Sequence, residues 1–320
     1  MISHWDDVES VRRERGHICG DWQALTGDAS EWVGVRRIRV APGKWSTPLH
    51  VEGSEEEIFY VLEGTGISVQ RVGSEEEAFA VGPDDCLVHL ALVHAHTLKA
   101  GPDGLDVLAF GERTYAANTL LPRAGVSWLG PTWVLEGAPD DHPWKREAAV
   151  GPPDVADPVA SVERPERVVN ARDVTEEVRD GATVARAVRD LGRAAGSYKT
   201  GLRLFEVRPG KLLNPPHCHS AEEEIFVVLD GEGSLEVWPH LRQGGAHESH
   251  PVRRGSVVAR PAGTGRPHTF RAGDAGLSVL AYGTRDPRDM TYYPRSGKVN
   301  LRGLGLIGRL DVLDYWDGED

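Results

Sequence analysis

Hydrophobic and polar residues alternate along several short segments of the chain. The alternation is clear in residues 33–43 (VGVRRIRVAPG) and 201–210 (GLRLFEVRPG). Because successive side chains of a strand point to opposite faces, this period of two predicts half-buried β-strands. In residues 224–238 (EIFVVLDGEGSLEVW) an apolar β-branched run is followed by DGEG and a second alternating run. That pattern predicts a β-hairpin that turns at 230–233.

A helix-like spacing of charged and apolar positions is confined to two segments, Asp7–Arg15 and Val174–Arg189. We expect short helical arms there. The 37 glycines and 21 prolines are spread along the chain without a period, so they place turns between the apolar runs. The predicted fold class is therefore all-β, with few helical turns.

The sequence repeats itself. Residues 43–66 and 210–233 align without a gap at an offset of 167, and residues 107–125 and 279–297 align at an offset of 172. A fixed offset over so much of the chain indicates a tandem duplication. The predicted organisation is an N-terminal domain (1–147), a Pro- and Val-rich linker (148–167) and a C-terminal domain (168–320), each a small β-barrel able to enclose a ligand.

The arms of the two repeats are expected to cross onto the neighbouring barrel, over Asp6–Arg15 in the first repeat and Val169–Val178 in the second. Such crossing would hold two barrels of one chain together. A homodimer of the whole chain is compatible with the sequence.

Charge and cysteine content narrow the class of partner. The chain has 49 acidic and 36 basic residues, a net charge of −13, which argues against binding to nucleic acid or to an anionic membrane surface. The three cysteines form no CxxC pair, and no apolar stretch reaches the length of about 18 residues that a membrane span needs. We expect a soluble cytoplasmic protein whose partner is a small molecule.

The second repeat carries a candidate metal site. His217 and His219 are two residues apart, so on a strand their side chains point to the same side while Cys218 points away. Glu224 begins the next apolar run, and His268 follows a later turn. Three imidazoles and one carboxylate suit Fe or Mn best, with Ni, Zn or Cu as further choices, and leave coordination positions open for water or substrate.

The first repeat departs from this set. His50 and Glu57 occupy the positions of His217 and Glu224, Glu52 replaces the second histidine, and His96 matches His268. A carboxylate can replace an imidazole for a hard metal, so His50, Glu52, Glu57 and His96 are a candidate second site. The alternative is that this site decayed after the duplication.

Each candidate site lies beside an acidic cluster, Glu55–Glu57 or Glu222–Glu224. At most one carboxylate of each cluster is expected to point inward, and its neighbours are expected to be solvated.

The ordered pattern of Gly210, His217, His219, Glu224 and Gly231, followed by Gly255, Pro261, Gly263 and His268, resembles the two motifs of the cupin superfamily. One extra residue precedes His217, two extra residues precede His268, and the asparagine that ends the second motif is missing. Because both repeats share the pattern, the whole chain resembles a bicupin. The resemblance implies two double-stranded β-helix (jelly-roll) barrels and a metal site in the second.

The leading functional hypothesis is a metal-dependent, dioxygenase-like enzyme that acts on a small oxygen-rich molecule. A redox-neutral decarboxylase or isomerase would use the same ligands, because one fold and one metal site support several chemistries. A non-catalytic binding or storage cupin is the hypothesis from a different class. Its weakness is the complete ligand set of the second repeat, which packing alone does not require.

Overall fold

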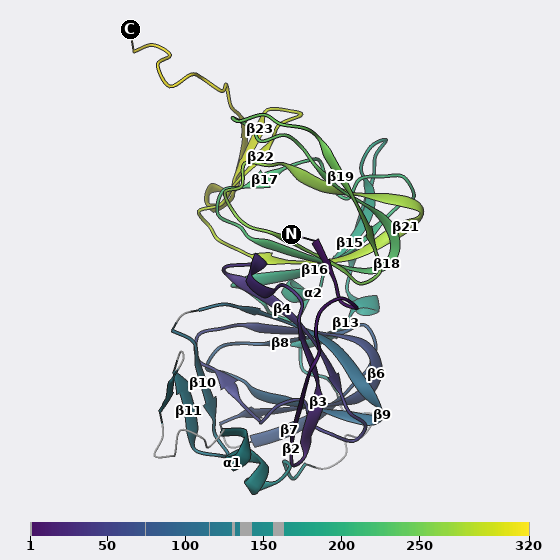
Figure 1. The fold of residues 1–320 in the computed structure, drawn as a ribbon, viewed down its shortest axis with the longest axis vertical. Helices are drawn as coiled ribbons and strands as arrows, with labels where there is room; N and C mark the ends of the chain where they lie inside the picture. The colour runs from purple at the N-terminus through teal and green to yellow at the C-terminus, as the bar shows by residue number, and fades with distance from the viewer. Residues whose placement is uncertain are drawn as a thin grey trace.

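The computed structural model describes residues 2–73, 75–114, 116–129, 132–134, 143–155 and 163–319. Two strand-rich barrels are stacked along the long axis of the molecule (Figure 1). The helical segments of the described residues are short: α1 (Pro143–Val150), α2 (Leu191–Ala194) and the 3-10 turns η1 (Gly27–Ala29), η2 (Ala171–Asp173) and η3 (Arg302–Leu304). The all-β prediction is confirmed.

The first barrel is built from an eight-stranded and a four-stranded sheet. The larger sheet has the order β13-β8-β6-β9-β4-β3-β2, with β7 paired to β6, and the smaller has the order β12-β11-β10-β5. The bounds are β2 (Val11–Arg15), β3 (Ile18–Ala24), β4 (Val33–Val40), β5 (Val51–Glu52), β6 (Glu57–Val72), β7 (Glu75–Val81), β8 (Asp85–His89), β9 (Ala95–Glu112), β10 (Asn118–Leu121), β11 (Val126–Leu129), β12 (Thr132–Val134) and β13 (Val168–Asn170).

The second barrel repeats this arrangement strand for strand. Its sheets have the orders β1-β20-β18-β21-β16-β15-β14, with β19 paired to β18, and β17-β22-β23-β24. The bounds are β1 (Ile2–His4), β14 (Glu176–Asp180), β15 (Ala185–Asp190), β16 (Thr200–Val207), β17 (Cys218–His219), β18 (Glu224–Val237), β19 (Glu248–Arg253), β20 (Ser256–Arg260), β21 (His268–Thr284), β22 (Met290–Tyr293), β23 (Lys298–Leu301) and β24 (Leu306–Arg309).

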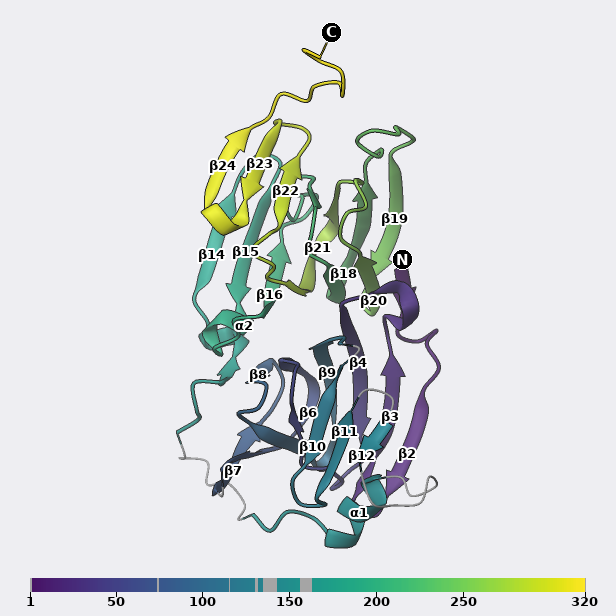
Figure 2. The same cartoon turned by 90° about the vertical axis from the view of Figure 1, so that its left-hand side faces the viewer.

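The two barrels exchange strands. The N-terminal strand β1 pairs with β20 of the second barrel, and the N-terminus lies beside β20 in Figure 2. β13, which follows the predicted linker, pairs with β8 of the first barrel. The expected crossing of the arms therefore occurs, but in the first repeat the segment that crosses is 2–4 rather than 6–15. The exchange interweaves the sheets at the predicted domain bounds, which stay a prediction.

The prediction of helical arms at Asp7–Arg15 and Val174–Arg189 is wrong. These segments contain β2 and the hairpin of β14 and β15, each paired antiparallel with its neighbour. All residues of β2 and β14 are exposed, because the two strands form edges of the larger sheets. Charged side chains are common on edge strands, where they oppose pairing with other chains. The charge pattern that resembled a helix is thus that of an exposed edge.

The predicted hairpin turn at 230–233 is also wrong. β18 runs without interruption through this segment, with irregular register between Val228 and Asp230 and between Gly231 and Gly233. Gly231 has a φ of 79°, and a Cβ atom there would lie 2.4 Å from the Gly276 carbonyl oxygen. The glycine therefore permits a close crossing of two strands, and the bulge bends the sheet into a barrel.

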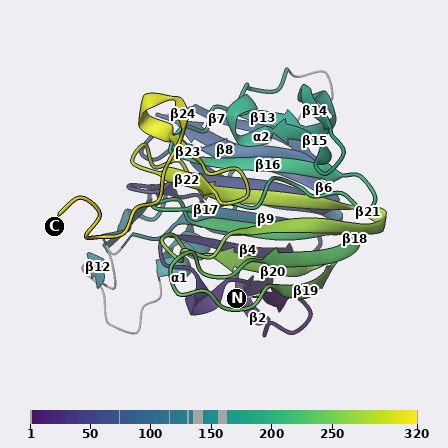
Figure 3. The same ribbon diagram turned by 90° about the horizontal axis from the view of Figure 1, so that it is seen from above.

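Three apolar cores account for the stacked shape, which is seen from above in Figure 3. One core fills the first barrel around Phe59 and Leu98, and another fills the second around Phe226 and Phe270. The third combines residues of both repeats, with Phe110 and Tyr282 in ring contact at 5.1 Å. Burial of this shared core joins the barrels into one unit.

A buried glutamate reaches from the second barrel into the first. The Glu223 carboxylate accepts hydrogen bonds from the Ser30 hydroxyl (2.8 Å) and from the backbone N–H groups of Glu31 (3.0 Å) and Trp32 (2.6 Å). Its side chain is buried. A charged acceptor with three donors is a strong contact in such surroundings.

Glu56 forms the reciprocal contact, 167 residues earlier in the chain. Its carboxylate is buried and accepts from the hydroxyls of Ser197 and Thr200, both at 2.6 Å, and from the backbone N–H groups of Tyr198 and Thr200. The expectation that the neighbours of Glu57 and Glu224 are solvated is therefore wrong. Glu56 and Glu223 point away from the barrel interiors and into the facing barrel.

Two further observations concern membrane spans and cysteines. Within the described residues, no helix is long and apolar enough to cross a membrane. Cys19, Cys86 and Cys218 are free and buried.

Candidate metal centres

The four predicted ligands of the second repeat converge in the second barrel. Backbone hydrogen bonds join His217 and His268 in both directions (3.2 and 2.8 Å), which places their side chains opposite each other. The rings of His217 and His219 lie 5.0 Å apart, and Glu224, the first residue of β18, contributes the carboxylate. Its Oε2 atom lies 3.1 Å from His268 Nε2 and 3.5 Å from His219 Nε2.

Several of the facing atoms have no hydrogen-bond partner. His219 Nε2, His268 Nε2 and Glu224 Oε2 are buried and unsatisfied. His217 Nδ1 donates a hydrogen bond to the Pro215 carbonyl oxygen at 2.9 Å, which leaves Nε2 for the centre of the cluster. Buried polar atoms without partners are costly, so this set fits a bound cation.

Two of the three imidazoles of the second cluster are held neutral beside one anion. Burial lowers the pKa of His217 to about 4 and also lowers the pKa of His268. Burial alone would lower the pKa of His219 too, but the Glu224 and Asp289 carboxylates raise it. Burial alone would raise the pKa of Glu224, but the facing His219 and His268 lower it. A neutral imidazole and an ionised carboxylate are the forms that bind a metal.

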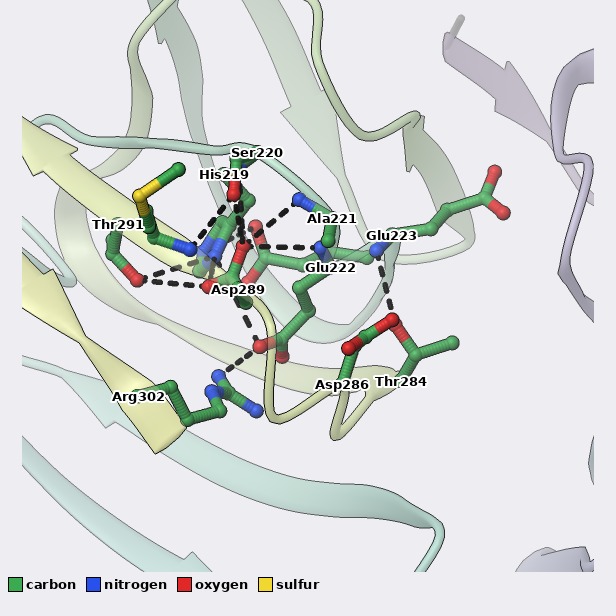
Figure 4. Close-up of polar contacts among 12 residues, drawn as sticks. His219, Ser220, Ala221, Glu222, Glu223, Thr284, Asp286, Asp289, Thr291 and Arg302 are labelled. Atoms are coloured by element: carbon green, nitrogen blue, oxygen red, sulfur yellow. Dashed lines mark hydrogen bonds and ion pairs between the residues drawn. The ribbon is translucent and has the colours of Figure 1, made fainter. Parts of the chain in front are cut away.

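Asp289 orients His219 from behind (Figure 4). One Asp289 oxygen lies 2.8 Å from His219 Nδ1 and 3.0 Å from the Thr291 hydroxyl. The other accepts backbone N–H groups of Ser220, Ala221 and Glu222 at 3.0 to 3.1 Å. This buried carboxylate fixes the ring of His219 with Nε2 toward Glu224, an arrangement typical of histidines that bind metals.

The sequence does not predict a role for Asp289, because no motif contains this residue. A comparison of the repeats offers one signal. At the offset of 172, Asp289 corresponds to Ala117, and at the offset of 167, His219 corresponds to Glu52. The second repeat thus has both the imidazole and the carboxylate that orients it, and the first repeat has neither.

The predicted residues of the first repeat also come together. His96 Nε2 lies 3.0 Å from Glu57 Oε2, and His50 Nε2 lies 3.5 Å from the same atom and 3.6 Å from Glu52 Oε1. The second oxygen of Glu52 accepts from the Thr119 hydroxyl at 2.7 Å. His50, Glu57 and His96 have ligand atoms close enough to hold a metal ion, as His217, Glu224 and His268 do.

A protonated histidine can neutralise the charge of the first cluster. Burial alone would lower the pKa of His50, but its contacts with the Glu57 and Glu52 carboxylates raise it to about 9. Burial, followed by the Glu57 charge, raises the pKa of Glu52. A protonated His50 between two carboxylates is an alternative to a metal ion, so both hypotheses for this site stand.

A buried histidine beside the first cluster was not expected. His89 stacks on His96 with ring centroids 3.8 Å apart and an angle of 3°. It lies opposite Glu57 in the sheet, at the position that Arg260 occupies opposite Glu224 in the second barrel. Burial, together with His96, lowers the pKa of His89. His89 therefore adds a neutral ring to the wall of the first site.

Each cluster lies in a cavity, and the two cavities differ in charge. The first has a volume of about 440 Å³ and the second about 640 Å³. The first is lined by three arginines and four glutamates: Arg13, Arg36, Arg113, Glu52, Glu55, Glu57 and Glu112. The second is lined by six cationic and three acidic side chains: Arg186, Arg193, Arg203, Arg285, Lys298, Arg302, Asp190, Glu222 and Glu224. Only the second cavity has an excess of positive charge.

Comparisons with known proteins agree with this architecture. Residues 203–281 match the family described as Cupin domain. The solved oxalate decarboxylase of Lactobacillus farciminis, in a formate complex, superposes with a TM-score of 0.62 at 16% identity, covering 89% of this chain and 86% of the other. The second barrel therefore contains a cupin domain. The two matching barrels give the chain the fold of a bicupin.

Other solved bicupins of similar fold come from Bacillus subtilis. An oxalate decarboxylase structure at pH 4.6 has a TM-score of 0.59 at 17% identity, covering 88% of this chain and 75% of the other. Another structure of the same enzyme, at 15% identity, belongs to a study of its Mn(II) centres. At these identities the likeness shows the fold. No curated protein matches this bicupin.

Proposed function

We propose that this bicupin is a metal-dependent enzyme that acts on a small carboxylate anion in its second cavity. The observation that carries the proposal is the convergence of three histidines and Glu224 beside a cavity that has an excess of cationic side chains. The storage hypothesis explains neither feature.

The ion that fits the cluster is Mn(II) or Fe(II), held by His217, His219, Glu224 and His268. Imidazole and carboxylate donors suit both ions. A divalent ion bound there would supply Lewis-acid polarisation of a substrate oxygen. The protein's part is to hold the donors: Asp289 fixes His219, and the backbone pair of His217 and His268 fixes the other two rings.

Charge in the second cavity supports an anionic substrate. One ionised ligand, Glu224, leaves a divalent ion with a net charge of about +1. The arginines are not all neutralised by neighbours: Arg203 and Arg285 share Asp190, at 3.1 and 3.2 Å. Because Arg presents several N–H donors in a planar array, these side chains suit recognition of a carboxylate.

A redox-neutral decarboxylation is the first reaction to test. The solved bicupins of similar fold include oxalate decarboxylases, and loss of CO₂ from a carboxylate needs a substrate bound as an anion. The chain's arginines would hold a second carboxylate while the first leaves. Dioxygenase activity, which the ligand set also permits, is the second candidate.

Assays of gas exchange separate these reactions. We expect the Mn- or Fe-loaded protein to release CO₂ from oxalate or another small carboxylate without stoichiometric consumption of O₂. A panel of dicarboxylates, keto acids, diols and catechols is measured for both gases. Stoichiometric O₂ uptake with a diol or catechol would support the dioxygenase, and neither gas changing with any compound would contradict an enzyme of either type.

Asp289→Asn tests the positioning of His219. The amide keeps the size of the side chain but removes the charge that holds the ring, so we expect metal affinity at the second site to fall about 10- to 100-fold. The measurement is an isothermal calorimetric titration of the protein with Mn(II). Asp286→Asn is the matched control, because this carboxylate lies nearby but pairs with the exposed Arg288. Equal affinities in the two variants would contradict the role of Asp289.

A further inference from the structure

The chain after β24 exposes a run of large apolar side chains. Residues Leu310–Glu319, here the C-terminal tail, extend away from the second barrel (Figures 1 and 2). Val312, Tyr315 and Trp316 are 81%, 80% and 65% exposed. Soluble proteins rarely leave such a contiguous apolar set uncovered unless it contacts something. The corresponding segment of the first repeat indicates which surface the tail contacts.

In the first barrel, α1 follows β12 in the sequence and packs onto the barrel. Trp144 of α1 packs against Trp22 of β3, with ring centroids 5.9 Å apart. The Arg13 guanidinium of β2 lies 5.7 Å from the Trp22 ring and 5.6 Å from the Trp144 ring. All three side chains line the first cavity, so this contact closes one of its walls.

Strand register identifies the matching surface in the second barrel. Arg13 lies opposite Gly20 in the pairing of β2 with β3, and Arg179 lies opposite Arg186 in the pairing of β14 with β15. Arg179 is therefore the counterpart of Arg13. Its side chain shares one face of the hairpin with Arg186.

The same register places an apolar residue where Trp22 would be. Trp22 lies opposite Ile38 of β4, and Val188 lies opposite Phe205 of β16. Val188 is partly buried against the core of the second barrel. Arg179, Arg186 and Val188 form what we call the β14–β15 face.

Trp316 is the counterpart of Trp144 in its place along the chain. Val134 of β12 and Gly308 of β24 occupy matching positions, opposite Ser127 and Val299. Trp144 follows Val134 by ten residues, and Trp316 follows Gly308 by eight. The second repeat thus has the cation and the tryptophan of the first-barrel contact, but here they lie apart.

Charge on the β14–β15 face favours the acidic tail. Arg179 and Arg186 are directly opposite in an antiparallel pair, and like charges in that position repel. Arg186 Nη1 is buried without a hydrogen-bond partner. Carboxylates occur every two or three residues along the tail, among its apolar residues: Asp311, Asp314, Asp317 and Glu319.

We propose that the C-terminal tail docks on the β14–β15 face of its own barrel, with Trp316 packed against Val188 and Arg179 and its carboxylates beside Arg186. Ile307 of β24 and Arg186 already line the second cavity, so the docked tail adds a wall to it. Trp316 is the seventh residue after Arg309. An extended segment of this length lets Trp316 lie up to about 25 Å from Arg309.

Limited proteolysis tests the docking. Trypsin cleaves after Arg309 and releases the tail, and intact mass follows this event alone. We expect the cleavage to be at least about tenfold slower in the wild type than in Trp316→Ala. Arg179→Glu should accelerate it to a similar extent. Arg242→Glu is the matched control, because it makes the same charge change at an exposed position on the β18–β19 loop and should leave the rate unchanged.

Two results would overturn the proposal. One is equal cleavage of the wild type, Trp316→Ala and Arg179→Glu. The other is protection that grows with protein concentration, since it would place the tail on a second copy of the chain. Protection that is independent of concentration and lost in both variants supports docking within one chain.

Discussion

Glu223→Ala is expected to lower the free energy of unfolding by about 3 kcal/mol or more. The substitution removes a buried charged acceptor and leaves the Ser30 hydroxyl and two backbone N–H groups without a partner. Hydrogen bonds to charged groups contribute about 1.5–3 kcal/mol each, and their effects do not add fully. Denaturant unfolding monitored by both circular dichroism and tryptophan fluorescence gives the change. Two probes are needed because a two-barrel chain need not unfold in one step.

Glu63→Ala is the matched control for this variant. Glu63 also reaches across the barrels, to Arg254 at 2.9 Å, but both side chains are more than half exposed. Exposed ion pairs contribute about 0–1 kcal/mol. Glu56→Ala should behave as Glu223→Ala does, since it makes the reciprocal contact. A loss of stability in Glu223→Ala no larger than in Glu63→Ala would contradict the assignment of these glutamates as the joint between the barrels.

Glu224→Gln is expected to remove most of the stabilisation that a divalent metal gives to the second barrel. The wild type should gain about 4 kcal/mol at a free metal concentration 1,000 times the dissociation constant. The glutamine keeps the size of the side chain but supplies no charge to balance the ion. We expect its affinity to fall by more than the factor of about 100 that accompanies loss of an outer positioning group. The measurement is the thermal midpoint with and without Mn(II).

Glu222→Gln is the control for that variant. Glu222 lines the same cavity and pairs with Arg302, but its oxygen lies 3.9 Å from His219 Nδ1, on the side of the ring away from Glu224. It should keep most of the metal-induced shift. Equal shifts in the wild type and Glu224→Gln would mean that the ion binds elsewhere.

The sequence was sufficient for features that local pattern or repetition encodes. Alternation identified the strands of both barrels, and the offset of 167 paired His50 with His217 and Glu57 with Glu224. The spacing of His217 and His219 was enough to place both rings in one cavity, since it follows from strand geometry.

Features that depend on contacts between distant parts of the chain were missed. Asp289 lies 70 residues from His219, and no local pattern links the two. Glu223 cannot be told apart from the neighbouring glutamates in the sequence. It joins the barrels by accepting hydrogen bonds from a loop that lies 191 to 193 residues earlier in the chain. The sequence wrongly predicts helices at the edge strands β2 and β14, because charged, exposed residues carry little information about secondary structure.

We propose that the second barrel holds a divalent metal ion through His217, His219, Glu224 and His268. The most direct test is metal analysis of protein purified without a tag, beside His219→Ala and the control His250→Ala, which changes a partly exposed histidine of β19 that pairs with Glu248. We expect His219→Ala to contain about one metal ion per chain fewer than the wild type and the control. A wild type without metal, even after reconstitution with Mn(II) or Fe(II), would contradict the account.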